Sequence, residues 1–139
     1  MNRGRRIAFD FGDVRIGVAI CDPDGILASP LPHLDARHPK LARQISELLD
    51  EYEPIAIYVG RPMNMSGSEG IAVDKVEGFV EKLKAITELP ITFIDERLST
   101  VDAARRLREA GKSAKDSKVL IDSMAAVAIL ESGLANEAR

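Results

Sequence analysis

Apolar residues recur along the chain at two spacings, one typical of β-strands and one typical of helices. Within residues 7–22, two runs rich in β-branched and aromatic residues lie on either side of a short turn, which predicts a β-hairpin. Residues 22–25, Asp-Pro-Asp-Gly, predict a tight turn. We then expect a third strand over 26–29, antiparallel to the second and ended by Pro30 and Pro32.

The following part of the chain alternates between the two spacings. Apolar residues at helical spacing predict surface helices over 39–52 and 71–86. Nearly continuous apolar runs predict buried strands over 55–59 and 91–94. Two strands that are each reached through a helix imply a parallel pair. The expected fold class is therefore α/β, with a mixed five-stranded sheet that joins an antiparallel meander to two parallel strands and is flanked by helices.

Two further helices are expected near the end of the chain. Ser99-x-x-Asp102 has the capping-box pattern, and Gly111 is a natural helix stop. The last helix is expected over about 117–134. The glycine-rich loop over 60–70 is compatible both with a plain surface connection and with a loop that contacts a ligand.

Composition indicates an ordinary globular chain. It has 139 residues, 45% of them hydrophobic and 29% charged, so we expect a single domain over 1–139. No apolar run approaches the roughly 20 residues that span a bilayer, and the first residues do not resemble a secretory signal. We therefore expect a cytoplasmic protein without a membrane partner. Cys21 is the only cysteine, which excludes an internal disulfide.

The charge is unevenly distributed. The net charge is −3, but residues 105–118 hold six basic side chains against two acidic ones. Arg3, Arg5 and Arg6 form a second basic group. Such groups are often plain solvated faces, but beside a carboxylate metal site they would suit a polyanionic partner.

Three acidic residues stand in unexpected surroundings. Asp10 lies within an apolar strand, Glu96 lies just past a strand end, and Asp122 interrupts the apolar stretch of the last helix next to small residues. In the expected sheet the first strand is central, so the three carboxylates can converge. Without a cation, like charges would repel and one carboxylate would be protonated.

A hard divalent ion removes this conflict. Mg²⁺ or Mn²⁺ prefers carboxylate oxygens and leaves other positions to water and substrate phosphate. Such sites cleave phosphodiesters with two ions, and Asp10 is the best-placed residue to bridge them. Asp95 is a weaker ligand candidate because neighbouring strand residues point to opposite faces.

Four segments of the chain resemble the bacterial YqgF family, also called RuvX. They are residues 7–22, the loop 60–70, Asp95-Glu96-Arg97-Leu98-Ser99-Thr100, and Ile121-Asp122-Ser123-Met124-Ala125-Ala126 with Ile129-Leu130. The family's members are described as nucleases of the 16S ribosomal RNA precursor, and earlier as Holliday junction resolvases. The resemblance implies an RNase H-like fold and a cytoplasmic nuclease that trims the 5′ end of this precursor.

The resemblance also assigns roles to residues. The family's acidic triad corresponds to Asp10, Glu96 and Asp122. Arg97 and Thr100 would support the site, and Arg15 and Lys118 would meet phosphate; together these four residues form the expected substrate-binding set. In the first turn the family often has a small and then a basic residue, whereas this chain has Asp13 and Val14.

Other functions fit parts of the sequence. A Holliday junction resolvase would use the same chemistry on four-way DNA as a dimer, but no dimerisation segment is evident, so we expect a monomer or weak homodimer. A non-catalytic nucleic-acid-binding module would have lost one of the three carboxylates. A sugar-kinase- or actin-like ATPase shares the Asp-x-Gly hairpin but needs two domains. His33 and His38 are expected to be surface residues beyond the third strand.

Overall fold

A computed structural model describes residues 2–62, 69–95 and 114–138, of which residue 69 and residues 114–122 are described by their backbone alone. The elements follow the chain in this order: β1 (Arg6–Phe11), β2 (Arg15–Cys21), β3 (Ala28–Asp35), α1 (Leu41–Tyr52), β4 (Ala56–Arg61), α2 (Glu69–Ile86), β5 (Ile91–Asp95) and α4 (Ala114–Glu137). The helix expected between Ser99 and Gly111 lies outside the described residues.

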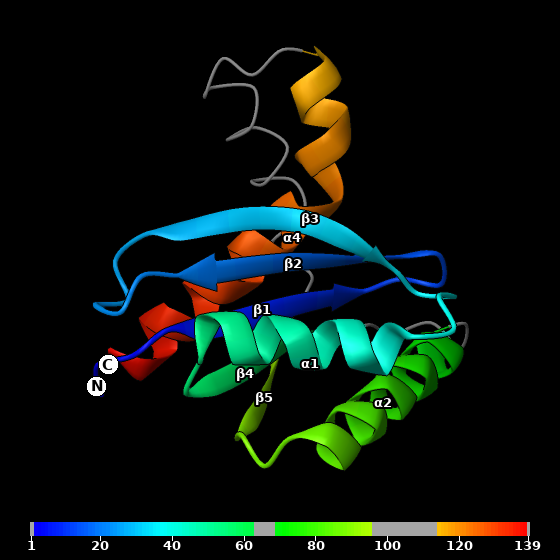
Figure 1. The fold of residues 1–139 in the computed structure, drawn as a ribbon, viewed down its shortest axis with the longest axis horizontal. Helices are drawn as coiled ribbons and strands as arrows, with labels where there is room; N and C mark the ends of the chain where they lie inside the picture. The colour runs from blue at the N-terminus through cyan, green and yellow to red at the C-terminus, as the bar shows by residue number, and fades with distance from the viewer. Residues whose placement is uncertain (1, 63–68, 96–113, 139) are drawn as a thin grey trace.

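The described strands form one mixed sheet with β1 at its centre. Their order is β3-β2-β1-β4-β5 (Figure 1). β2 runs antiparallel to both β1 and β3, whereas β4 runs parallel to β1 and β5 runs parallel to β4. This is the predicted meander with two parallel strands added, so the expected mixed α/β fold is confirmed.

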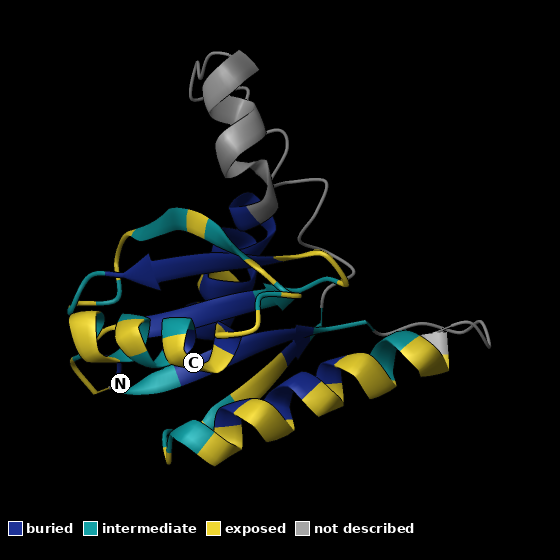
Figure 2. Ribbon diagram, turned by 45° about the vertical axis from the view of Figure 1, so that its right-hand side comes forward, coloured by how far each residue is buried: buried dark blue, intermediate teal, exposed yellow. Residues whose placement is uncertain are grey.

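Helices cover both faces of the sheet and bury a separate apolar layer on each. Odd-numbered residues of β1, such as Ile7 and Phe9, pack against α1 and α2, where Phe9 meets Phe79 edge to face with ring centroids 5.7 Å apart. Ala8 belongs to the opposite layer, which α4 covers. β1, β2 and β4 are mostly buried, and the outer sides of α1 and α2 are exposed (Figure 2). The edge strand β5 is only partly buried, so the expectation of a buried strand over 91–94 was wrong. The alternation along β1 therefore places Asp10 on the face toward α4.

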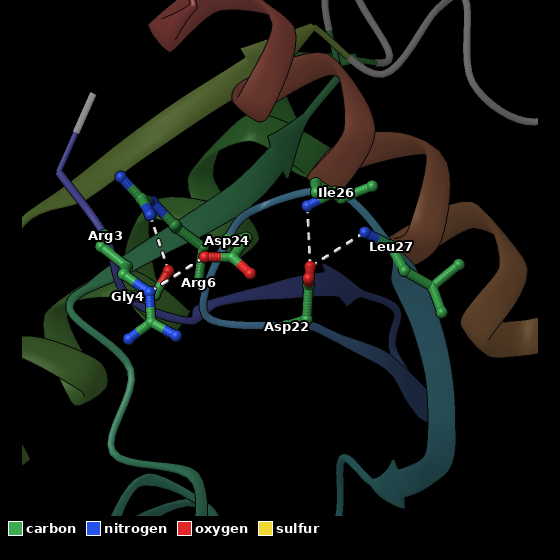
Figure 3. Close-up of polar contacts among 7 residues, drawn as sticks. All are labelled: Arg3, Gly4, Arg6, Asp22, Asp24, Ile26 and Leu27. Carbon is green, nitrogen blue, oxygen red and sulfur yellow. Dashed lines mark hydrogen bonds and ion pairs between the residues drawn. The ribbon is translucent and has the colours of Figure 1, made fainter.

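The third strand differs from the prediction at both ends. The Asp22 carboxylate accepts hydrogen bonds from the N–H groups of Ile26 and Leu27 at 2.7 and 2.9 Å, which holds both residues in the turn (Figure 3). β3 therefore begins at Ala28 and continues through Pro30 and Pro32, so the expectation that the prolines end it was wrong.

Prolines are tolerated in β3 because it is an edge strand. Only one side of an edge strand forms a hydrogen-bonded ladder, so a missing N–H on the other side costs nothing. The strand is also irregular, because its register against β2 shifts between Ile16 and Val18. His33 consequently lies within β3 and not beyond it.

Small residues bring α4 close to the sheet. Ala126 of α4 is fully buried in the apolar layer between this helix and the strands, so it serves close packing. A methyl group added at Gly133 would lie 2.5 Å from the Tyr58 ring. The tight contact explains why α4 presents glycine and alanine to the strands.

Arg6 is not part of a solvated basic group, which corrects the interpretation of the amino-terminal arginines. Its side chain is 1% exposed. The guanidinium donates to the Gly4 carbonyl and pairs with Glu137 near the end of α4, with Nη2 3.0 Å from Oε1. Arg3 pairs with Asp24 across the exposed turn (Figure 3). Arg6 thus ties the start of β1 to the end of α4.

Two expectations from composition concern the membrane and the cysteine. Among the described residues, no helix is both long and apolar enough to cross a membrane.

Cys21 is a buried thiol on β2, and its sulfur accepts the Arg6 N–H at 3.1 Å. Burial raises the pKa of this thiol, so it stays protonated.

Candidate active site

Asp10 occupies the position expected of a functional carboxylate on the central strand. It is the second-last residue of β1, it is half-buried, and it lies on the face that α4 covers. β1, β4 and β5 are parallel, so their carboxyl ends meet at this edge of the sheet. Open α/β sheets bind ligands at this edge. We name it the carboxyl edge.

Glycines leave the space beside Asp10 open. Asp10 pairs with Gly17 of β2, so the neighbouring strand presents no side chain there. On the other side, β4 pairs Val59 with Phe9, and the next residue of β4 is Gly60. A phosphate or a metal ion can therefore approach the carboxylate closely.

β5 leads toward the same edge. Its Ile94 pairs with Gly60 of β4 and is buried in the layer beneath α4. Asp95 is the last residue of β5, and alternation turns it to the opposite face. Glu96, the next residue, lies outside the described residues, as do Arg97 and Thr100.

α4 carries the third predicted acidic residue past the sheet. Asp122 belongs to this helix, but its side chain lies outside what the structure describes. The adjacent Ser123 is fully buried. Its hydroxyl accepts the Val18 N–H at 3.1 Å and donates to the Leu31 carbonyl, where the register of β2 and β3 shifts. Ser123 therefore fixes the position of α4 along the strands, one residue after Asp122 in the sequence.

Ser123 is a positioning residue that the sequence reasoning did not single out. A hydroxyl inside the apolar stretch of the last helix was a usable signal, because buried polar groups normally have partners. Its partners are unpredictable from sequence, since they arise from an irregular register between two other strands.

The predicted phosphate-contacting residues are only partly described. Arg15 is the first residue of β2 and is exposed. Lys118 lies on α4, described by its backbone alone. Most of the basic segment 105–118 lies outside the described residues, and so does most of the loop 60–70.

The turn after β1 contains an ion pair that the sequence did not indicate. Gly12 closes the turn through its N–H, which donates to the Arg15 carbonyl at 3.0 Å, and a Cβ at Gly12 would lie 2.7 Å from that oxygen. Asp13 then pairs with Lys75 of α2 at 2.9 Å. Asp13, at which the chain departs from the family pattern, thus has Lys75 as an ion-pair partner.

The donor chemistry at this edge suits a hard cation. A carboxylate flanked by glycines offers oxygen ligands with room for water and phosphate, as Mg²⁺ and Mn²⁺ require. Within the described residues alone, no three histidine, cysteine, aspartate or glutamate side chains are grouped to hold a metal ion. A complete site would need contributions from Glu96 and Asp122.

Comparison with known sequences finds one matching family and relatives that share one name. The family described as "RuvX: Holliday junction resolvase" matches residues 4–136. A Streptomyces coelicolor protein named "Putative pre-16S rRNA nuclease" is 47% identical over 99% of this chain and 83% of its own length. A protein of the same name from Rhodococcus jostii is 44% identical over 99% of this chain and 80% of its own length.

Comparison with solved structures supports the fold. Thermus thermophilus RuvC in complex with a Holliday junction aligns with a TM-score of 0.59 at 15% identity, covering 97% of this chain and 96% of that one. Fowlpox virus resolvase with junction DNA aligns with a TM-score of 0.62 at 10% identity, covering 97% and 99%. The expected RNase H-like fold is confirmed.

Proposed function

Because the chain belongs to the RuvX family, we propose that it is a cytoplasmic, phosphodiester-cleaving nuclease that processes the 5′ end of the 16S ribosomal RNA precursor. The observation that carries the proposal is the placement of Asp10. A half-buried carboxylate faces α4 on the central strand, between two glycines, at the carboxyl edge. Relatives named for this RNA support the choice of substrate.

We assign the cleavage chemistry to Asp10, Glu96 and Asp122. β5 ends at Asp95 beside β4 at the carboxyl edge, and Glu96 is the next residue of the sequence. Ser123 anchors α4 one residue after Asp122. The three carboxylates would hold Mg²⁺ or Mn²⁺, which when bound activates water and neutralises charge on the leaving oxygen.

The other family positions would handle the substrate. Arg15, exposed at the start of β2, would meet a phosphate next to the scissile one. Arg97 and Thr100 would support Glu96, and Lys118 would contact phosphate from α4. In this proposal the whole of 1–139 acts as one nuclease domain, as a monomer or weak homodimer.

The test compares two nucleic acids. Purified protein is incubated with a 16S precursor leader RNA and with a four-way DNA junction, in Mg²⁺ or Mn²⁺, beside the Asp10→Asn variant, which keeps shape and removes charge. We expect cleavage of the RNA alone and a loss of about 10³-fold or more in the variant. Cleavage of the junction alone would identify a resolvase instead.

A third outcome would reject catalysis. If the protein binds nucleic acid without cleaving it, and Asp10→Asn binds equally well, then the chain is a binding module. Circular dichroism of the variant checks that it remains folded.

A further inference from the structure

The exposed side of α2 separates its charges into two flanks. One line follows the helix with spacings of four, three, four and four residues and contains no acidic side chain: Ile71, Lys75, Gly78, Lys82 and Ile86. We name this line the basic flank. The acidic residues follow a parallel line, which we name the acidic flank: Asp74, Glu77 and Glu81.

Ion pairs show which way each flank faces. Glu77 of the acidic flank pairs with Arg61 at the end of β4, with Nη2 and Oε1 3.1 Å apart. Lys75 of the basic flank pairs with Asp13 in the turn between β1 and β2. The basic flank therefore lies toward the turn that follows Asp10, so it is continuous with the carboxyl edge.

Two hollows lie along the basic flank. A pocket of about 290 Å³ is lined by Lys75 and Asp13 together with Phe11, Pro62 and Val76. A second pocket, of about 330 Å³, lies between Lys82 and the loop that follows β3. The surface between them is open, because a Cβ added at Gly78 would meet nothing within 4 Å.

The second hollow brings positive charge from another element. Arg37 lines it from the loop after β3. This loop lies against the β1–β2 turn, since the Ala36 N–H donates to the Val14 carbonyl at 2.9 Å. Cationic side chains from two elements thus converge along one path that begins at the carboxyl edge.

We propose that a single-stranded segment of the RNA substrate leaves the carboxyl edge along the basic flank. This inference rests on the proposed function. Phosphates would contact Lys75, Lys82 and Arg37, and a base would enter the apolar pocket beside Phe11. Lys75 and Lys82 are about 10.5 Å apart along the helix axis, at 1.5 Å per residue, so they would meet different phosphates.

An ordinary solvent-exposed helix face does not account for this charge pattern as well as an RNA-binding face does. Lysines on exposed helices commonly alternate with glutamates at spacings of three or four, as Lys84 does with Glu81 at 3.5 Å. The basic flank contains no acidic residue, and a pocket lies beside each of its two lysines. A strand that is cleaved at Asp10 must also pass over this edge.

Binding is measured in the Asp10→Asn background, which prevents cleavage. The probe is a labelled single-stranded 16S precursor leader RNA, titrated over a range of salt. We expect Lys75→Gln and Lys82→Gln each to weaken binding about 5-fold at about 0.1 M salt and to lower the salt slope by about 0.7. Lys84→Gln is the matched control, with the same charge change on the same helix, and should change neither.

A variant of opposite sign guards against misfolding as an explanation. Asp13→Asn removes the carboxylate that pairs with Lys75, so it should tighten RNA binding. A base analogue, 2-aminopurine, scanned along the RNA should change its fluorescence at one position, and Ile71→Ala should reduce that change.

The outcomes separate this inference from the proposed function. If the wild type fails to cleave RNA but the two lysine variants differ from Lys84→Gln as expected, the binding path holds without the nuclease assignment. If the wild type cleaves RNA and all three lysine variants bind alike, the path is wrong and the nuclease assignment is unaffected. Absence of RNA binding in every protein overturns the path as well.

Discussion

At the scale of single residues, buried polar groups fix geometry that apolar packing leaves undetermined. The Ser123 hydroxyl joins α4 to two strands at once, by accepting from Val18 and donating to Leu31. A lone hydroxyl can hold a helix in register because an unmade hydrogen bond in a buried place is costly. Asp22 performs a similar task at the surface, where it organises a turn.

Ser123→Ala should destabilise the protein. The variant leaves the Val18 N–H and the Leu31 carbonyl without this partner, at a cost of about 1–3 kcal/mol in the free energy of unfolding. Urea denaturation measures the change. Ser132→Ala, on the exposed side of the same helix, should change it by less than about 0.5 kcal/mol. Equal stability of the two variants would contradict the anchoring role.

Asp22 should make stability depend on pH. Hydrogen bonds from Leu27 and Ile26 hold the pKa of its carboxyl below the ordinary value. Because the folded pKa is the lower one, the stabilisation is complete above about pH 4 and is lost as pH falls through the depressed value. The difference in Tm between wild type and Asp22→Asn should therefore shrink on acidification from about pH 7 to about pH 3. A difference that stays constant would exclude this contribution.

At the scale of elements, the end of α1 carries backbone strain. α1 ends at Glu53, whose φ of 48° and ψ of 53° are left-handed, and whose N–H donates to the Leu49 carbonyl at 2.9 Å. Glycine is the usual residue for this conformation because it has no Cβ to collide with the backbone. Pro54 follows and prevents the helix from continuing.

Glu53→Gly should stabilise the protein. Relief of the left-handed strain should raise the free energy of unfolding by about 0.5–1 kcal/mol. Glu51→Gly, the same change two residues earlier inside α1, should lower it by about 1 kcal/mol. Thermal and urea unfolding of the pair check both signs. A loss of stability at position 53 would show that the glutamate side chain makes a compensating contact.

At the scale of the whole molecule, the last helix is joined to the sheet at both ends of their contact. Ser123 links α4 to the strands near the candidate site, and the Arg6–Glu137 pair links α4 to the start of β1. Arg6 is nearly completely buried, so its positive charge is stabilised by Glu137 and by the Gly4 carbonyl. Contacts with α4 thereby hold together residues from the two ends of the chain.

Glu137→Gln should destabilise the protein. The variant removes the negative charge that pairs with the buried Arg6 guanidinium, so the free energy of unfolding should fall by about 1–3 kcal/mol. The loss is smaller than for a fully buried pair because Glu137 is 34% exposed. The exposed pair Arg43–Glu47 supplies the control, since Glu47→Gln should cost less than about 0.5 kcal/mol. Similar losses from both changes would contradict a special role for Arg6.

Much of this protein was determined by local sequence alone. Except for β3, periodicity placed the strands and helices of the described residues, since an alternating strand or an amphipathic helix shows its spacing within a few residues. Asp10 was recognisable because a carboxylate inside an apolar run needs a partner. The resemblance of four segments then supplied the family and the fold.

The tertiary structure decided what depends on contacts between distant segments. Only the sheet order shows that β3 is an edge strand and can contain prolines. Only the packing shows that Arg6 is buried, that Ser123 bridges two strands, and which way the two charged flanks of α2 face. The physical reason is that burial and hydrogen-bond partners belong to pairs of residues far apart in the chain, and a spacing pattern describes only neighbours.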